Sequence, residues 1–182
     1  MSLQPVHRIG RFARSVAARA PDTADTEWAH RWLTSAEQRL FDRMPVVDRA
    51  HSIGVARGVV AHLDRIGTTP DDPDALWVLA AALTHDVGKS AAGLGTYGRV
   101  VATLSEAVGG ASMARVWAAR RGMTRKVGLY LQYPELGAEL LAVAGSDERV
   151  VAWAAQHHEP ESSWTVPVEA GRLLAAADDE AL

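Results

Sequence analysis

Apolar residues recur at helical spacing along almost the whole chain, and no segment shows the strict apolar–polar alternation of a half-buried strand. Alanine and leucine dominate the hydrophobic fraction of 48%, whereas aromatic residues contribute 6%. Because alanine and leucine favour helices over sheets, the pattern predicts an all-α fold. A chain of 182 residues has the length of one domain, and we therefore expect a single-domain helical bundle.

The chain divides into a main domain over residues 48–182 and a helical extension over residues 1–47 that packs on it. Residues 5–20 place Ile9, Phe12 and Val16 on one face and are rich in arginine. This pattern favours an amphipathic helix that packs on the domain. The alternative is a basic arm that contacts a membrane or a nucleic acid.

Local signals predict where several helices begin and end. Thr34 followed by Glu37 forms a capping box at a helix start. The next apolar pattern, from residue 46 onward, predicts one long helix closed by Gly67. Asp72 followed by Pro73 then begins a helix that is apolar nearly all round, and we expect that helix to lie at the centre of the fold.

The second half of the chain predicts a series of further helices. Short helices are expected near 97–107, 111–120 and 124–131, followed by one that begins at Pro134 and ends at Gly145. Ser146 is the expected cap of the next helix. The last helix is expected to start at Pro167.

The composition excludes several classes of function. The chain has no cysteine, which excludes disulfides, thiolate zinc sites and cysteine nucleophiles. Its net charge of −3 disfavours binding to nucleic acid through bulk electrostatics. No apolar run is long enough to span a bilayer and the N-terminus does not read as a secretory signal, so a cytoplasmic location is expected. The oligomeric state is not encoded in any pattern we find.

Histidines and aspartates recur near the ends of separate predicted helices. His51 lies early in one helix, His85 and Asp86 end the next, and Asp178 lies near the end of the last. Imidazole and carboxylate groups are the ligands that a cysteine-free chain offers to a first-row transition metal, and ligands from several helices of a bundle can converge on one ion. An adjacent pair such as His85 and Asp86 can share an ion where the backbone loosens at a helix end, and Gly88 favours such loosening.

The order of these residues resembles the HD-domain superfamily of metal-dependent phosphohydrolases. The matching segments are "DRAHSIGVA" with His51, "ALTHDVGK" with His85 and Asp86, and "LLAAADDEAL" with Asp178. The resemblance covers about residues 48–182 and implies that these side chains bind a divalent metal ion: Mn, Fe, Zn, Co or Mg. The segments "HDVGK", "YPELGAELL" and "AQHHEP" are similar to the HD-GYP branch of the superfamily.

The chain departs from the HD-GYP branch at two places. Tyr133 stands where that branch has a metal-binding histidine, and the Gly-Tyr-Pro signature does not follow "HHEP". A phenol is a poor metal ligand near neutral pH because it stays protonated. The departures therefore favour one tightly bound metal ion, with His157 and His158 as ligands of a weak second ion or as contacts to the substrate.

The predicted chemistry is hydrolysis of a phosphate ester, with a small phosphorylated molecule such as a nucleotide or cyclic nucleotide as substrate. Asp86 and Lys89 are the expected catalytic residues, because a lysine three positions after the aspartate faces the same side of a helical turn and can neutralise a phosphate oxygen. Arg115 and Arg121 lie in a stretch without acidic residues and are candidate phosphate contacts. A solvated basic face is the alternative for these arginines.

Two other functions stay open at the level of the sequence. The first is a catalytically degenerate HD module that binds a metal ion or a nucleotide for regulation, which the substitution at Tyr133 favours. The second is an HD-type di-iron oxygenase, which needs two fully ligated irons and is disfavoured by the same substitution.

Overall fold

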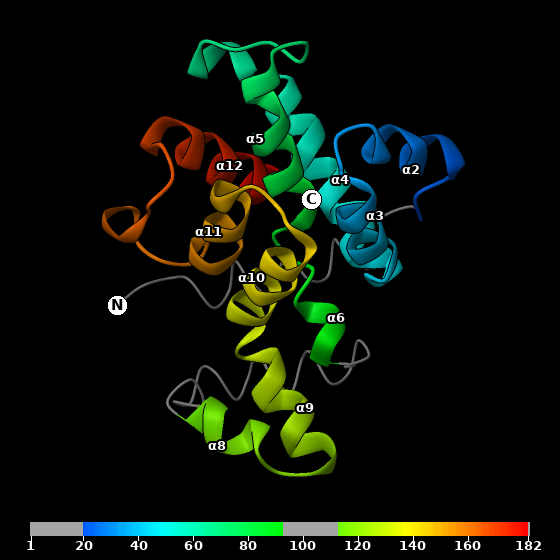
Figure 1. Cartoon of the computed structure of the whole chain (residues 1–182), viewed down its shortest axis with the longest axis vertical. Coiled ribbons are helices and arrows are strands. Elements are labelled where there is room, and N and C mark those ends of the chain that lie inside the picture. Colours follow the sequence, from blue (N-terminus) through cyan, green and yellow to red (C-terminus); the bar gives the residue numbers. More distant parts are fainter. Residues whose placement is uncertain (1–19, 93–112, 182) are drawn as a thin grey trace.

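The computed structural model describes residues 20–92 and 113–181, and these residues form helices and no strand (Figure 1). The predicted all-α fold is therefore confirmed. The helices expected over 5–20 and 97–107 lie outside the described residues. Within the described part of the chain, no helix is both long and apolar enough to cross a membrane.

Helix α5 (Pro73–Thr84) is the central element of the fold. Residues from Trp77 to Thr84 are buried without exception, as expected for a helix that is apolar on every face. Helix α5 packs directly against α3 (Ser35–Asp42), α4 (Val46–Val60), α11 (Glu148–Gln156) and α12 (Val168–Glu180). Figure 1 shows α12 and α11 on one side of α5 and α4 on the other. The C-terminal end of α5 consequently lies among the ends of several other helices.

The remaining helices extend this bundle. Helix α10 (Tyr133–Ala144) packs along α11 and contacts both α3 and the short helix α6 (Lys89–Ala92), while α2 (Thr23–His30) lies beside α3 on the α4 side of the bundle. Helices α8 (Ala114–Ala118) and α9 (Gly122–Tyr130) pack on each other at one end of the molecule, and α9 reaches α6 and α10 (Figure 1). Short 3₁₀ helices cover Leu63–Ile66 (η1) and Glu161–Ser163 (η3).

Several predicted helix ends are confirmed by their hydrogen bonds. The Thr34 hydroxyl accepts from the backbone N–H of Glu37, and the Glu37 carboxylate accepts from the backbone N–H of Thr34. Asp72 caps α5 by accepting from the N–H of Asp74. Gly145 ends α10 in the left-handed conformation, with φ at 75°.

Two predicted helix ends are wrong, and the first is the C-terminal end of the helix that begins at residue 46. The single long helix expected from residue 46 to Gly67 ends at Val60, and after His62, with φ at −134°, the chain continues as the 3₁₀ helix η1. This tighter turn buries Leu63 in the core. Gly67 still closes the segment, with φ at 70°.

The cap of α11 is Asp147 and not the expected Ser146. The backbone N–H of Ser146 donates to Leu141 and completes the end of α10, which places the residue in the preceding helix's C-terminal turn. Asp147 accepts from the N–H of Arg149 instead. The short connection between α10 and α11 therefore uses Ser146 for the first helix and Asp147 for the second.

Candidate metal centre

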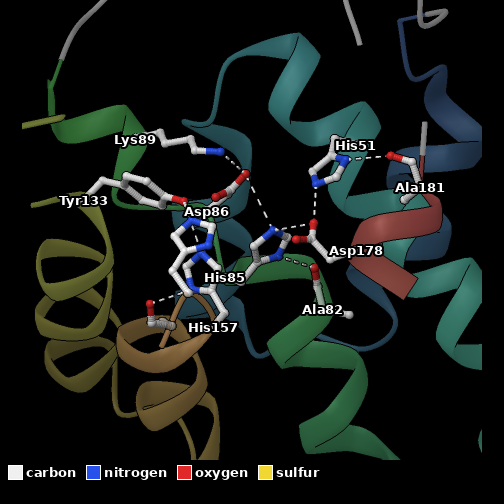
Figure 2. Close-up of polar contacts among 11 residues, drawn as sticks. His51, Ala82, His85, Asp86, Lys89, Tyr133, His157, Asp178 and Ala181 are labelled. Atoms are coloured by element: carbon white, nitrogen blue, oxygen red, sulfur yellow. Dashed lines mark hydrogen bonds and ion pairs between the residues drawn. The ribbon is translucent and has the colours of Figure 1, made fainter. Parts of the chain in front are cut away.

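His51, His85 and Asp178 meet at the end of the central helix. They come from α4, from the residue after α5 and from α12, respectively, and one ligand atom of each lies within 4.8 Å of the others. His51 Nε2 is 2.8 Å from Asp178 Oδ1, and His85 Nε2 is 3.6 Å from the same oxygen. Figure 2 shows both rings turned toward this carboxylate.

The end of α5 brings the neighbours His85 and Asp86 to one side. Beyond Thr84 the backbone tightens into bonds between residues three apart, in which Val87 N–H donates to Thr84 and Lys89 N–H donates to Asp86. His85 Nε2 consequently lies 3.6 Å from Asp86 Oδ2. The departure from α-helical geometry that the sequence predicts at this helix end is present, but the backbone tightens there and does not loosen.

Backbone carbonyl oxygens fix the protons of the two imidazoles. The Nδ1 of His85 lies 3.0 Å from the Ala82 carbonyl oxygen, which belongs to the last turn of α5, and the Nδ1 of His51 lies 3.1 Å from the Ala181 carbonyl oxygen. Since a carbonyl oxygen only accepts, each Nδ1 carries the hydrogen. The Nε2 of a neutral ring is then left as an acceptor, which is the state in which histidine binds a metal ion.

Asp86 is almost completely buried, at 1% exposure. Its Oδ2 lies 2.5 Å from Lys89 Nζ, whereas its Oδ1 has no hydrogen-bond partner in the part of the chain that the structure describes. Burial alone would raise the pKa of Asp86, but the Lys89 ammonium and the nearby imidazoles hold that pKa well below its usual range. The carboxylate is therefore ionised, and one of its oxygens is available to a further ligand.

The charge of Asp178 is balanced in the same way. Burial opposes ionisation, but the hydrogen bond with His51 and the charge of His85 lower the pKa of Asp178. Burial would also lower the pKa of His51, yet the hydrogen bond to Asp178 and the charge of Asp86 raise it. The raised pKa of His51 and the lowered pKa of Asp178 both show that positive charge is favoured between these two side chains.

His157 and His158 lie on the other side of His85. The centroid of the His157 ring is 5.2 Å from that of His85, and the ring centroids of His157 and His158 are 4.1 Å apart. His157 Nδ1 lies 2.9 Å from the Ala154 carbonyl oxygen in the last turn of α11, the same arrangement as His85 has with α5. Burial and the neighbouring His158 lower the pKa of His157 well below its usual value, so this ring is neutral.

The structure brings together most of the residues that the sequence singles out. The cluster contains His51, His85, Asp86, Lys89, Asp178, His157 and His158. Arg115 in α8 and Arg121 directly before α9 have exposed side chains. Their role as phosphate contacts stays a prediction. The roles of the clustered residues as ligands or catalysts are likewise predictions.

Sequence reasoning missed Tyr133 as a member of the cluster. It treated this residue as a lost metal ligand, whereas the buried hydroxyl hydrogen-bonds to both His157 and His158. Figure 2 shows Tyr133 beside His157. The Lys89 ammonium also lies 4.8 Å from the centre of the tyrosine ring. The one signal in the sequence was the position of Tyr133, directly before the proline in the first turn of α10.

Comparison with known proteins agrees with this geometry. The family model of the HD domain matches residues 49–181, which includes His51, His85, Asp86 and Asp178. No curated protein and no solved structure gives a significant match to the chain. Because the family model covers well over half of the sequence, the chain belongs to the HD-domain family.

Proposed function

We propose that the chain is a metal-dependent phosphohydrolase in which His51, His85, Asp86 and Asp178 hold a divalent metal ion. The observation that carries this proposal is the facing arrangement of acceptor atoms. The Nδ1 hydrogens of His51 and His85 are directed to carbonyl oxygens, so the Nε2 lone pairs of neutral rings face Asp178 Oδ1 at 2.8 Å and 3.6 Å. Atoms held this close need positive charge between them, which a proton on His51 Nε2 can supply in the metal-free protein and which the proposed ion would replace.

The donor set fits such an ion. Two nitrogen or oxygen ligands that each lie about 2.1 Å from one ion are at most about 4.2 Å apart, and the separations of 2.8 Å and 3.6 Å lie within this range. Asp86 supports the fit, because its buried Oδ1 has no hydrogen-bond partner within the described residues. Histidine nitrogen and carboxylate oxygen suit Mn, Fe, Zn, Co and, less well, Mg.

A divalent ion bound here would supply a water of lowered pKa and would polarise a phosphoryl oxygen. The chain itself contributes the fixed charges around that position. Asp86 Oδ2 is held by Lys89, which leaves Oδ1 to orient a ligand or a water molecule. The Lys89 ammonium has three hydrogens, so those that do not point at Asp86 can bind a phosphate oxygen as negative charge develops.

The proposed substrate is a small phosphate ester, with nucleotides and cyclic nucleotides as the leading candidates. Two observations support a phosphate ester as the substrate: membership of the HD-domain family, and the ammonium group of Lys89 beside the cluster. Arg115 and Arg121 are proposed to add phosphate contacts, because an arginine fork can bind two oxygens of one phosphate.

The proposal is tested by elemental analysis of purified protein together with a screen of phosphomonoesters and phosphodiesters in the presence of manganese. We expect bound metal and turnover in the wild type, and the loss of both in Asp86→Ala. A protein that binds metal but cleaves nothing across a broad panel would instead support a regulatory HD module. Bound iron with dioxygen-dependent turnover would support an oxygenase.

A further inference from the structure

The Tyr133 hydroxyl lies between the ring nitrogens of two adjacent histidines. Its oxygen is 3.2 Å from His157 Nε2 and also within hydrogen-bonding distance of His158 Nε2. Tyr133 is the first residue of α10, whereas both histidines follow the end of α11. The contact therefore joins two helices at the edge of the proposed metal centre, as Figure 2 shows for Tyr133 and His157.

The hydrogens of this group can be assigned from its partners. His157 donates its Nδ1 hydrogen to the Ala154 carbonyl, so the Nε2 of the neutral ring can only accept. A phenol has one hydrogen, and Tyr133 donates it to His157. The hydroxyl oxygen is then the acceptor for the Nε2 hydrogen of His158. Both Nε2 atoms, which would otherwise be available to a metal ion, are consequently used by the tyrosine.

Lys89 adds a positive charge on the same side of the cluster. Its Nζ lies 2.5 Å from Asp86 Oδ2 and 4.8 Å from the centre of the Tyr133 ring. A carboxylate links two ions by offering one oxygen to each, and the Oδ2 of Asp86 is already occupied by this ammonium. A second divalent ion would also lie close to a fixed like charge, which is unfavourable in a buried site.

We propose that Tyr133 is a positioning residue that keeps the centre mononuclear, by holding His157 and His158 in a hydrogen-bonded group in place of a second metal ion. This inference rests on the proposed metal site at His51, His85, Asp86 and Asp178. It assigns His157 and His158 to the wall of the substrate site and excludes them as metal ligands.

The test is the number of ions per chain in three proteins: wild type, Tyr133→His and the matched control Tyr130→His. Each protein is loaded with excess manganese and desalted, and its metal content and manganese EPR spectrum are measured. We expect a single ion with an uncoupled spectrum in the wild type. Tyr133→His should gain a second, coupled ion, because three imidazoles then surround the position of the hydroxyl. Tyr130→His adds a histidine nearby, because the ring centroids of Tyr130 and Tyr133 are 5.7 Å apart. This control should keep a single ion.

A second measurement keeps the test decisive if Tyr133→His does not fold, which circular dichroism will show. In the double variant His157→Ala/His158→Ala, manganese affinity should fall by less than about 10-fold, the lower limit for losing even a supporting partner of a ligand. A second ion in the wild type, a larger loss in the double variant, a folded Tyr133→His with a single ion, or a second ion in Tyr130→His would each overturn the inference. Two ions in the wild type would leave the proposed hydrolase standing, whereas no ion would overturn both proposals.

Discussion

His51 and Asp178 are 127 positions apart in the chain, yet His51 Nε2 lies 2.8 Å from Asp178 Oδ1. The His51 ring is held from its other side by the carbonyl oxygen of Ala181, one turn beyond the aspartate. The end of α12 therefore supplies both a carboxylate that faces His51 Nε2 and an acceptor that sets its proton. Two contacts from one helix end fix both the position and the tautomer of the imidazole.

The first prediction concerns this pair. Replacing His51 by alanine should lower manganese affinity by more than about 100-fold, because loss of a supporting partner alone costs about 10–100-fold. Titration calorimetry on metal-free protein measures the change. His62→Ala is the matched control, since His62 lies beyond the end of α4 and outside the cluster. Equal losses in both variants would contradict a role for His51 as a ligand.

The second prediction concerns the ion pair between Lys89 and Asp86. The side chain of Asp86 is 2% exposed and that of Lys89 is 18% exposed, so Lys89→Met leaves a buried carboxylate without its partner. We expect the free energy of unfolding of the metal-free protein to fall by about 3–5 kcal/mol. Urea unfolding measures this value. The exposed Lys126 is the control, and Lys126→Met should change stability by no more than about 1 kcal/mol, because contacts of an exposed charge contribute little.

Saturating manganese should recover part of the stability that Lys89→Met loses. A ligand that binds only the folded state stabilises it by mass action, and the ion would give the Asp86 carboxylate a new positive partner. An unfolding free energy that is the same in Lys89→Met and in the wild type would show that Asp86 does not depend on the lysine.

Much of the fold could be predicted from the sequence because helix ends are encoded locally. The capping box of Thr34 and Glu37 and the cap of α5 at Asp72 need only residues within one turn, and the structure has both. The wrong cap at Ser146 arose where two helix ends overlap. The competition between ending α10 and starting α11 is decided by backbone hydrogen bonds that residue types alone do not reveal.

The candidate site was only partly predictable for a similar reason. Residue types and order were enough to name His51, His85, Asp86 and Asp178, which the structure gathers at one helix end. The hydrogen bonds that set the imidazoles go to alanine carbonyls, whose side chains carry no signal. The position of Tyr133 depends on how closely α10 approaches the segment before α6, which is a tertiary property.

The third prediction concerns that close approach at Gly88. A Cβ atom at this position would lie 1.9 Å from the carbonyl oxygen of Tyr133 and 2.7 Å from the backbone nitrogen of Gly137. Both neighbours are backbone atoms, so neither can move without shifting α10. Gly88→Ala should therefore destabilise the protein by about 3 kcal/mol or more, as measured by urea unfolding.

Gly54 is the matched control for this substitution. A Cβ atom there would meet only the Cβ of Ala181, at 3.5 Å, which is an ordinary contact, and the residue lies inside α4. Alanine is favoured over glycine in a helix interior by about 0.5–1 kcal/mol, so Gly54→Ala should stabilise the protein. A Gly88→Ala protein as stable as the wild type would show that α6 and α10 do not pack this closely.

The fourth prediction concerns the pH dependence of the cap at Asp147. The side chain accepts hydrogen bonds from the guanidinium and the backbone N–H of Arg149, and these bonds lower the pKa of Asp147 from its ordinary value of 3.8. A carboxyl group whose pKa is lower in the folded state stabilises the fold above the unfolded-state pKa, and this contribution is lost as the pH falls through the folded-state value.

Asp147→Asn keeps a capping oxygen but not the charge, whereas Asp147→Ala removes the cap and should cost about 1 kcal/mol at pH 7. The thermal midpoint of the wild type should exceed that of Asp147→Asn at pH 7, and the difference should shrink as the pH is lowered below 3.8. A difference that stays constant between pH 7 and the acid range would show that the ionised carboxylate adds nothing to the cap.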